Sequence, residues 1–168
     1  GLFCEWWRCG TPDWAIGGEM VYGDWSAGFS DVTIGGAVNA PFRWHITKTG
    51  VTDIAFQVKP GMLFGSAEVG RGDRFVFGLR GELSLPVTIE LTRKVNLITG
   101  GAIPLTYMIV DGADDLFVLP LLARIGAEVQ ATEKITPWLL FELGPAIGFG
   151  DGTESEFAFR IWVGSAFW

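Results

Sequence analysis

The longest two-residue period in the chain runs from Phe75 to Leu91. Every odd position in this stretch is apolar or glycine, whereas the even positions between them are small, polar or charged. Side chains alternate between the two faces of a β-strand, so the pattern predicts a long strand with one apolar face and excludes a helix. A polar turn at 92–96 and a second alternating segment at 97–110 complete a predicted β-hairpin.

The remainder of the chain repeats this alternation. Strands are predicted at 14–22, 32–46, 54–65, 75–91, 97–110, 117–130, 138–149 and 157–167. Three short turns around Lys48, Lys94 and Lys134 each carry Thr and Lys, whereas the intervening loops are acidic. We therefore expect an all-β fold at 13–168, a single closed antiparallel transmembrane β-barrel of eight strands with up-and-down topology.

Composition narrows the class of protein. A chain of 168 residues is one domain by length, and its apolar residues, 49% of the total, are dispersed rather than gathered into a run of about 18 that could form a transmembrane helix. The net charge of −7 argues against a nucleic-acid partner, because binding to phosphates requires clustered Lys and Arg. The sequence has neither a signal peptide nor an initiator Met, which indicates a processed form or a fragment.

The charged residues of the predicted strands decide which face would contact lipid. If the apolar set points outward, nine charged side chains drawn from seven strands point to the lumen at middle depth. These are Glu19, Arg43, Lys59, Arg80, Glu82, Arg124, Glu128, Glu142 and Arg160. Isolated charges in a low-dielectric site are costly, so this near-balanced set predicts a lumen ionic network, in which Arg160 would pair with carboxylates on flanking strands such as Glu19 and Glu142.

A soluble, lipocalin-like ligand-binding barrel, with the apolar face inward, is the alternative orientation. Three features favour the transmembrane one. The apolar face is continuous and larger than a small barrel interior can hold, and the opposite face is rich in Gly and Ala. The last predicted strand is also aromatic, with Phe167 on the apolar face and Trp168 off it.

We treat residues 1–12 as a separate N-terminal periplasmic segment. Its Cys4 and Cys9 match neither a haem attachment site nor a zinc site, and they are candidates for a local disulfide in an oxidising compartment, with free thiols as the alternative. Trp6 and Trp7, together with Trp14, suggest a position at a membrane interface, although an ordinary packed loop would also accommodate them. The sequence indicates no metal site, no cofactor and no catalytic residue.

From about residue 14 to 168 the chain resembles the eight-stranded outer-membrane barrels of the OmpA and OmpX type, in its alternation, turn polarity and terminal aromatics. The resemblance implies a multi-pass protein of the bacterial outer membrane, surrounded by lipid and lipopolysaccharide, with periplasmic termini and acidic loops outside. Strand prolines depart from the simplest version and predict bulges. They are Pro41, Pro60, Pro86, Pro104, Pro120 and Pro145.

An eight-stranded barrel has a lumen filled by side chains, so we expect a structural, adhesive or partner-binding role rather than an open pore. Partners would be other envelope proteins, reached through the loops or the N-terminal segment. A lipid-modifying enzyme is an alternative, in which His45, the single histidine, would need a Ser or Glu partner. A narrow ion path along Arg80, Arg124, Glu142 and Arg160 is another alternative, and the acidic loop 111–115 is either a cation site or a solvated turn.

Overall fold

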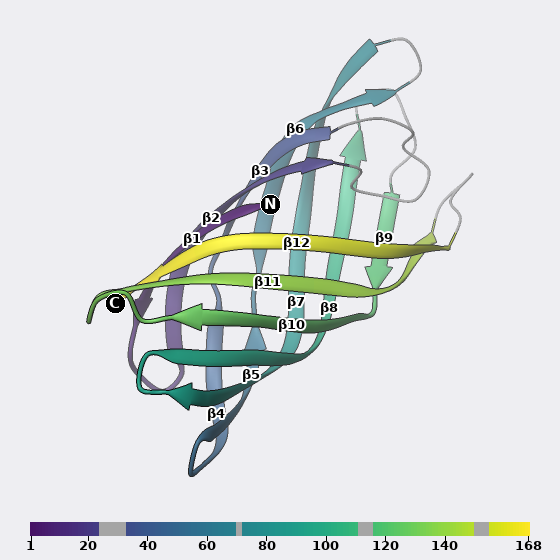
Figure 1. Cartoon of the computed structure of the whole chain (residues 1–168). Coiled ribbons are helices and arrows are strands. Elements are labelled where there is room, and N and C mark those ends of the chain that lie inside the picture. The colour runs from purple at the N-terminus through teal and green to yellow at the C-terminus, as the bar shows by residue number, and fades with distance from the viewer. Residues whose placement is uncertain (24–32, 70–71, 111–115, 150–154) are drawn as a thin grey trace.

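The computed structural model describes residues 1–23, 33–69, 72–110, 116–149 and 155–168, which fold into one all-β sheet (Figure 1). In these ranges there are twelve strands and no helix. The strands are β1 Leu2–Arg8, β2 Asp13–Gly23, β3 Thr33–Asn39, β4 Phe42–Thr49, β5 Thr52–Val58, β6 Gly61–Val69, β7 Gly72–Thr92, β8 Val95–Val110, β9 Leu116–Pro120, β10 Leu122–Val129, β11 Ile135–Phe149 and β12 Glu156–Phe167. The described part of the chain therefore contains no helix that is long and apolar enough to cross a membrane.

The expected count of eight strands is wrong, in part because prolines divide three of the expected strands. The ladder is interrupted at Pro41 between β3 and β4, at Pro60 between β5 and β6, and after Pro120 between β9 and β10. Proline has no N–H to donate to a neighbouring strand, so regular pairing stops there. Backbone hydrogen bonds at these interruptions, such as the one from the Ala40 N–H to the Pro60 carbonyl at 2.9 Å, keep the two halves of each strand in line.

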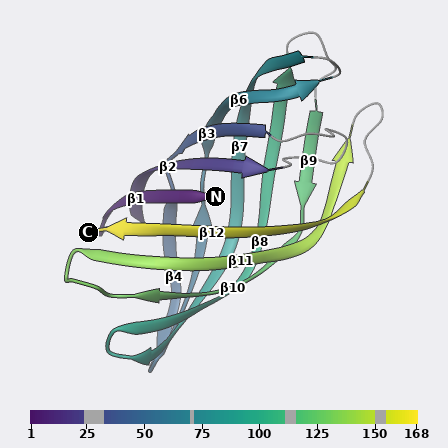
Figure 2. The ribbon, with the colours of Figure 1, turned by 45° about the horizontal axis from the view of Figure 1, so that its top comes forward.

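The other additional strand is β1, which lies in residues 1–12, the segment predicted to be separate from the barrel. It pairs antiparallel with β2 and parallel with β12, where Leu2 to Trp6 lie beside Val163 to Phe167. The expectation of a purely antiparallel sheet is therefore wrong at this one pair among the described strands. β1 lies between the last and first predicted strands, as Figure 2 shows. Its alternation explains this position, because Phe3, Glu5 and Trp7 are buried on one side.

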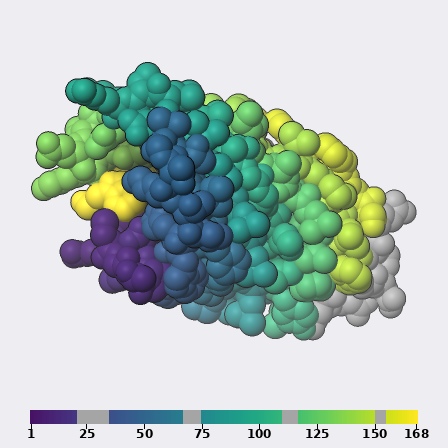
Figure 3. All heavy atoms as spheres, turned by 90° about the horizontal axis from the view of Figure 1, so that it is seen from below, coloured from purple at the N-terminus to yellow at the C-terminus, as the bar shows by residue number. Residues whose placement is uncertain are grey.

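The pairings pass through all the described strands and return to their start. Three pairs of short strands, β3 with β4, β5 with β6 and β9 with β10, each follow one another along a single line. Counting each pair as one position, the order of neighbours is β1, β2, β3/β4, β5/β6, β7, β8, β9/β10, β11 and β12, and β12 pairs again with β1. The sheet curls so that one face is enclosed (Figures 1 and 2). In Figure 3 the atoms of successive segments follow one another across the surface. The predicted central hairpin is present as β7 and β8.

The two faces of the sheet differ in chemistry. Large apolar side chains are exposed on the outer face, as at Met20, Leu79, Ile125, Phe159 and Val163. The enclosed face holds carboxylates that are almost inaccessible, since Glu19, Glu82 and Glu142 are 4%, 2% and 1% exposed. The buried charged groups therefore lie on the enclosed face, and the exposed large apolar groups lie on the outer face.

The enclosed face is built in three layers along the strands. At the end where β2, β8 and β11 finish, Leu63, Val76, Met108 and Val118 form a buried apolar cluster with small residues. The charged side chains follow in the middle. At the end with the short turns, Trp7 packs with Ala15 and Ala166, and Trp168 stacks on it with 5.8 Å between ring centroids.

The two ends of the chain lie at different depths. The Trp168 N–H donates to the Lys134 carbonyl at the turn end, as expected, whereas the Gly1 amine donates to the Ile161 carbonyl, part of the way along β12. Phe167 stacks on Trp6 on the outer face, 5.6 Å between centroids. The predicted opposite orientations of Phe167 and Trp168 are present.

Candidate functional site: an enclosed ionic network

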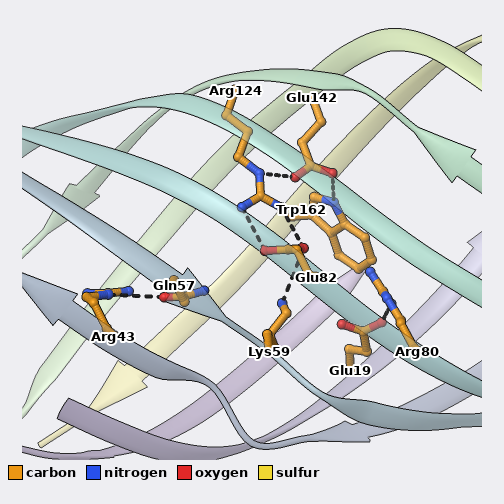
Figure 4. A network of polar contacts seen from close by, with 9 residues as sticks. All are labelled: Glu19, Arg43, Gln57, Lys59, Arg80, Glu82, Arg124, Glu142 and Trp162. Atoms are coloured by element: carbon orange, nitrogen blue, oxygen red, sulfur yellow. Dashed lines mark hydrogen bonds and ion pairs between the residues drawn. The ribbon is translucent and has the colours of Figure 1, made fainter. Parts of the chain in front are cut away.

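Arg124 is the centre of the ionic network on the enclosed face (Figure 4). Its Nη1 and Nη2 atoms donate to the two carboxylate oxygens of Glu82 at 2.9 and 2.7 Å. Its Nε atom donates to Oε1 of Glu142. Paired, two-point bonds of this kind are the strongest that a guanidinium makes with a carboxylate, so Arg124 is held in a fixed orientation.

Both carboxylates have a further partner. The indole Nε1 of Trp162 donates to Oε2 of Glu142 at 2.8 Å, and Nζ of Lys59 lies 3.9 Å from Oε2 of Glu82. All these groups are buried or nearly so. Because each buried charge has an opposite charge or a hydrogen-bond donor beside it, the cost of removing it from water is offset.

A second ion pair lies beside this group. Arg80 on β7 forms a salt bridge with Glu19 on β2; the Glu19 side chain is buried and that of Arg80 is largely so. The Arg80 guanidinium carbon also lies 5.7 Å from the ring centroid of Trp162, within cation–π range. Trp162 therefore contacts both the Arg80 pair and the Arg124 group.

Strand register explains how these side chains meet. On β11, Glu142 stands directly opposite Arg124 of β10 and opposite Arg160 of β12. Glu82 is farther away, because β8 lies between β7 and β10. On β8 the residue opposite Arg124 is Gly100, which has no side chain to block the reach of the guanidinium towards Glu82.

The expected ion pair of Arg160 with Glu19 is wrong. Glu19 pairs with Arg80, and Glu142 pairs with Arg124. Within the described residues no carboxylate lies within 4.0 Å of the Arg160 guanidinium, although the charges of Glu142 and Glu82 act on it. The physical reason is β1, which separates β12 from β2 and so removes Glu19 from its reach.

Two other expected members lie nearer the turn end and form hydrogen bonds. Arg43 donates from Nε to Oε1 of Gln57 at 3.0 Å, and its guanidinium lies 4.3 Å from the ring centroid of Trp7. Glu128 accepts from Nδ2 of Asn96 at 2.8 Å. The ion-paired part of the expected set is thus Glu19, Lys59, Arg80, Glu82, Arg124 and Glu142.

Sequence reasoning missed Glu5, because it lies in the segment set apart at 1–12. Glu5 is buried, accepts a bond from Nε1 of Trp7 at 2.9 Å, and lies within electrostatic range of Lys59 and Arg43. The signal was present as the alternation of Phe3, Glu5 and Trp7. Adding Glu5 to the four expected carboxylates gives five, which equals the five expected cations.

A cavity of about 120 Å³ lies among these side chains. Its lining includes Glu5, Arg43, Lys59, Glu82 and Arg124, together with aromatic residues. A polar space of this size is large enough for several water molecules. The arrangement can therefore hold charge and water inside the sheet.

The remaining sequence predictions have separate outcomes. The disulfide is corrected to two free, exposed thiols. Cys4 lies in the extended β1 and Cys9 follows its last residue, Arg8, which is already roughly 13 Å from Cys4, beyond the reach of a disulfide. His45 contacts Asp13 and Asp53 rather than a Ser or Glu. The acidic loop 111–115 lies outside the described residues.

Comparison with known proteins adds no relative. No family model, no curated protein and no solved structure matches this chain.

Proposed function

We propose that this chain is an integral β-barrel of the bacterial outer membrane, with a structural, adhesive or partner-binding role and a lumen filled by side chains. The barrel would be closed by the pairing of β1 with β12. The observation that carries the proposal is the enclosed, paired charge beneath an outer face of exposed apolar side chains. That distribution is the one expected where the surroundings are lipid.

The energetic argument rests on the outer face. Exposed apolar area costs about 25 cal/mol per Å² in water, and soluble monomers rarely carry contiguous apolar patches above a few hundred Å². Here large apolar residues are exposed on most of the described strands. A bilayer would remove this cost. The alternative lipocalin-like barrel would require the same residues on the enclosed face.

Exposed aromatic residues at both strand ends support the same proposal. Trp6, Trp14 and Trp44 lie near the end with the short turns, and Phe75 and Phe157 lie near the opposite end, where β2, β8 and β11 finish. Such aromatic girdles are typical of the two membrane interfaces. We take the membrane-spanning part as the region between them, so the tip of the β4 and β5 hairpin, residues 45–53, lies outside it on the water side.

A closed lumen is supported by the three layers of the enclosed face. Any solute would have to pass the apolar cluster around Leu63 and Met108, the paired charges around Arg124 and the aromatic stack of Trp7 and Trp168. Displacing the buried ion pairs would leave charges without partners, which is strongly unfavourable. We therefore favour a structural or binding role over transport.

A narrow ion path is the second candidate, and the cavity of about 120 Å³ beside the charged residues is the observation in its favour. Reconstitution in planar bilayers separates the two. The structural proposal expects no steady single-channel conductance. Regular conductance that changes on replacing Arg124 would support the ion path.

The membrane proposal is tested by a charge on the outer face. Ile125 is 53% exposed and lies next to Arg124 in the middle of the sheet. In a bilayer, Ile125→Arg would destabilise the protein by about 2 to 4 kcal/mol, whereas a water-exposed site would change by only about 0.5 kcal/mol. Urea unfolding in lipid vesicles measures this, with Thr132→Arg in an exposed turn as the control.

Cell fractionation is the accompanying measurement. The proposal expects the protein in the outer-membrane fraction, with a change in gel migration on heating. A monomer that stays soluble without detergent, together with a neutral Ile125→Arg variant, would refute it.

A further inference from the structure

His45 is placed between two carboxylates, one on each side of its imidazole ring. Nε2 lies 3.0 Å from Oδ2 of Asp13, and Nδ1 lies 2.9 Å from Oδ1 of Asp53. The three side chains come from β4, β2 and β5. The imidazole is 43% exposed, so protons reach it from water.

Only the protonated ring satisfies both contacts. The imidazolium donates from both nitrogens, whereas the neutral ring donates from one nitrogen and presents a lone pair on the other. A carboxylate facing that lone pair would be repelled. A metal ion cannot replace the proton, because the carboxylates lie at opposite nitrogens and a single ion cannot contact all three side chains.

The two contacts differ in what they join. The bond to Asp53 lies within the β4 and β5 hairpin, whose backbone pairing already holds both residues. The bond to Asp13 joins the hairpin to β2, where backbone pairing with β4 consists of Asp13 with Arg43 and Trp14 with Phe42. Beyond Arg43, the contact of the His45 side chain with Asp13 links the hairpin to β2. Loss of one bond would therefore release Asp13 rather than Asp53.

Asp13 in turn holds the segment after β1. Its Oδ1 atom accepts from the Gly10 N–H at 2.8 Å, so the carboxylate bridges the β1 to β2 turn and the hairpin. Trp7, which stacks on Trp168 and lies beneath Arg43, is on the adjoining strand β1. The contact thus lies at the turn-end mouth of the enclosed space.

We propose that His45 is a pH-operated latch, which ties the β4 and β5 hairpin to the β1 to β2 turn while its imidazole is protonated and releases it on deprotonation. The charged groups around the ring are Asp13 on β2, Asp53 on β5, and Arg43 and Lys48 on β4 itself, while β7 presents Thr88 to Asp53. The two carboxylates dominate because they touch the ring.

The sign of the pH dependence follows from these contacts. Hydrogen bonds to Asp53 and then to Asp13 raise the pKa of His45 above its ordinary value. A group whose pKa is raised on folding stabilises the folded contact at low pH and loses that effect as the pH rises through the folded-state pKa. The latch is therefore closed in mild acid and open in base, irrespective of membrane insertion.

Spin labels measure the opening directly. One label goes on the native Cys9 in the turn and one on Thr49→Cys in the hairpin, with Cys4→Ser present in all variants. The full chain is folded in detergent and compared at about pH 5.5 and about pH 9, on either side of the imidazole transition and above that of the carboxylates. We expect the distance between the two labels to show one narrow distribution at the acid pH. At the basic pH we expect an additional population with a longer distance.

Two variants distinguish a latch from general loosening. In Asp53→Asn, the amide donates to neutral Nδ1, so Nε2–H still reaches Asp13 and the distribution should stay narrow at both pH values. In Asp13→Ala, the link is removed, and the broad distribution should be present at both. A wild-type distribution that is the same at both pH values, or an Asp53→Asn variant as pH-dependent as wild type, would overturn the proposal.

The single histidine gives an independent reading. NMR of the ring in the folded chain should show a titration midpoint above the ordinary value of about 6.5, lowered by Asp53→Asn. A wild-type midpoint at or below the ordinary value would also refute the latch.

Discussion

Arg124 and Glu82 form a two-point ion pair across an intervening strand, with β8 lying between β10 and β7. The pair joins elements that share no backbone pairing in the described sheet. It therefore braces the enclosed face independently of the ladder. Glu142 and Lys59 extend the brace to β11 and to the linker between β5 and β6.

Arg124→Leu should be more damaging than Arg160→Leu. The first leaves Glu82 and Glu142 without their shared partner and should cost about 3 to 5 kcal/mol. The second removes a cation without a close ion pair among the described residues and should cost only about 1 kcal/mol. Urea unfolding in detergent compares the two, and equal losses would contradict the assigned pairing.

The parallel contact between β1 and β12 can be tested by cross-linking. Cys4 stands opposite Ser165, so Ser165→Cys should form a disulfide with it under mild oxidation, in a Cys9→Ser background. Val163→Cys is the matched control, because it stands opposite Leu2 and its diagonal distance to Cys4 of roughly 7 Å is unfavourable for a disulfide. Mass spectrometry identifies the linked peptides. Preferential linkage of Val163→Cys would reject the observed register.

Replacing Glu5 by a neutral residue should destabilise the protein much less than replacing it by a cation. Glu5→Gln still accepts the Trp7 bond and should cost about 1 kcal/mol. Glu5→Lys adds a positive charge near Lys59 and Arg43 and should cost about 3 to 5 kcal/mol. Denaturant unfolding distinguishes them. Comparable stability of the two variants would mean that the side chain is not enclosed.

Gly100 should not tolerate a side chain. Its φ is 136°, and a Cβ atom there would collide with the Leu85 carbonyl oxygen. Gly100→Ala should therefore cost about 1 to 3 kcal/mol or more. Gly81, which has open space at the same atom, is the control, and Gly81→Ala should be nearly neutral. Unfolding of both variants in the same detergent gives the comparison.

The strand content and the division of the faces could be read from the sequence. Alternation is a local property, and a strand must place Glu82 and Leu83 on opposite faces whatever its neighbours are. The short turns around Lys94 and Lys134 were predictable for the same reason. So was the separation of the charged set from the large apolar residues.

Pairing across the sheet was not predictable in the same way. The predicted pairing of Arg160 with Glu19 required the last predicted strand to adjoin the first, whereas the short β1 lies between them. A strand of seven residues with two tryptophans and one cysteine reads equally well as a loop, because its pairing partners are distant in the chain. The position of β1 between β12 and β2 also places Glu5 among the charged side chains of the enclosed face.

Local sequence thus determined which residues lie in strands and which side chains share a face, because both follow from the two-residue repeat of an extended backbone. Tertiary structure alone decided which charges meet. The reach of Arg124 over Gly100 to Glu82, and the placing of His45 between Asp13 and Asp53, depend on the order and register of strands far apart in the chain. Those are set by the long-range pairing of the whole sheet, and no local pattern encodes them.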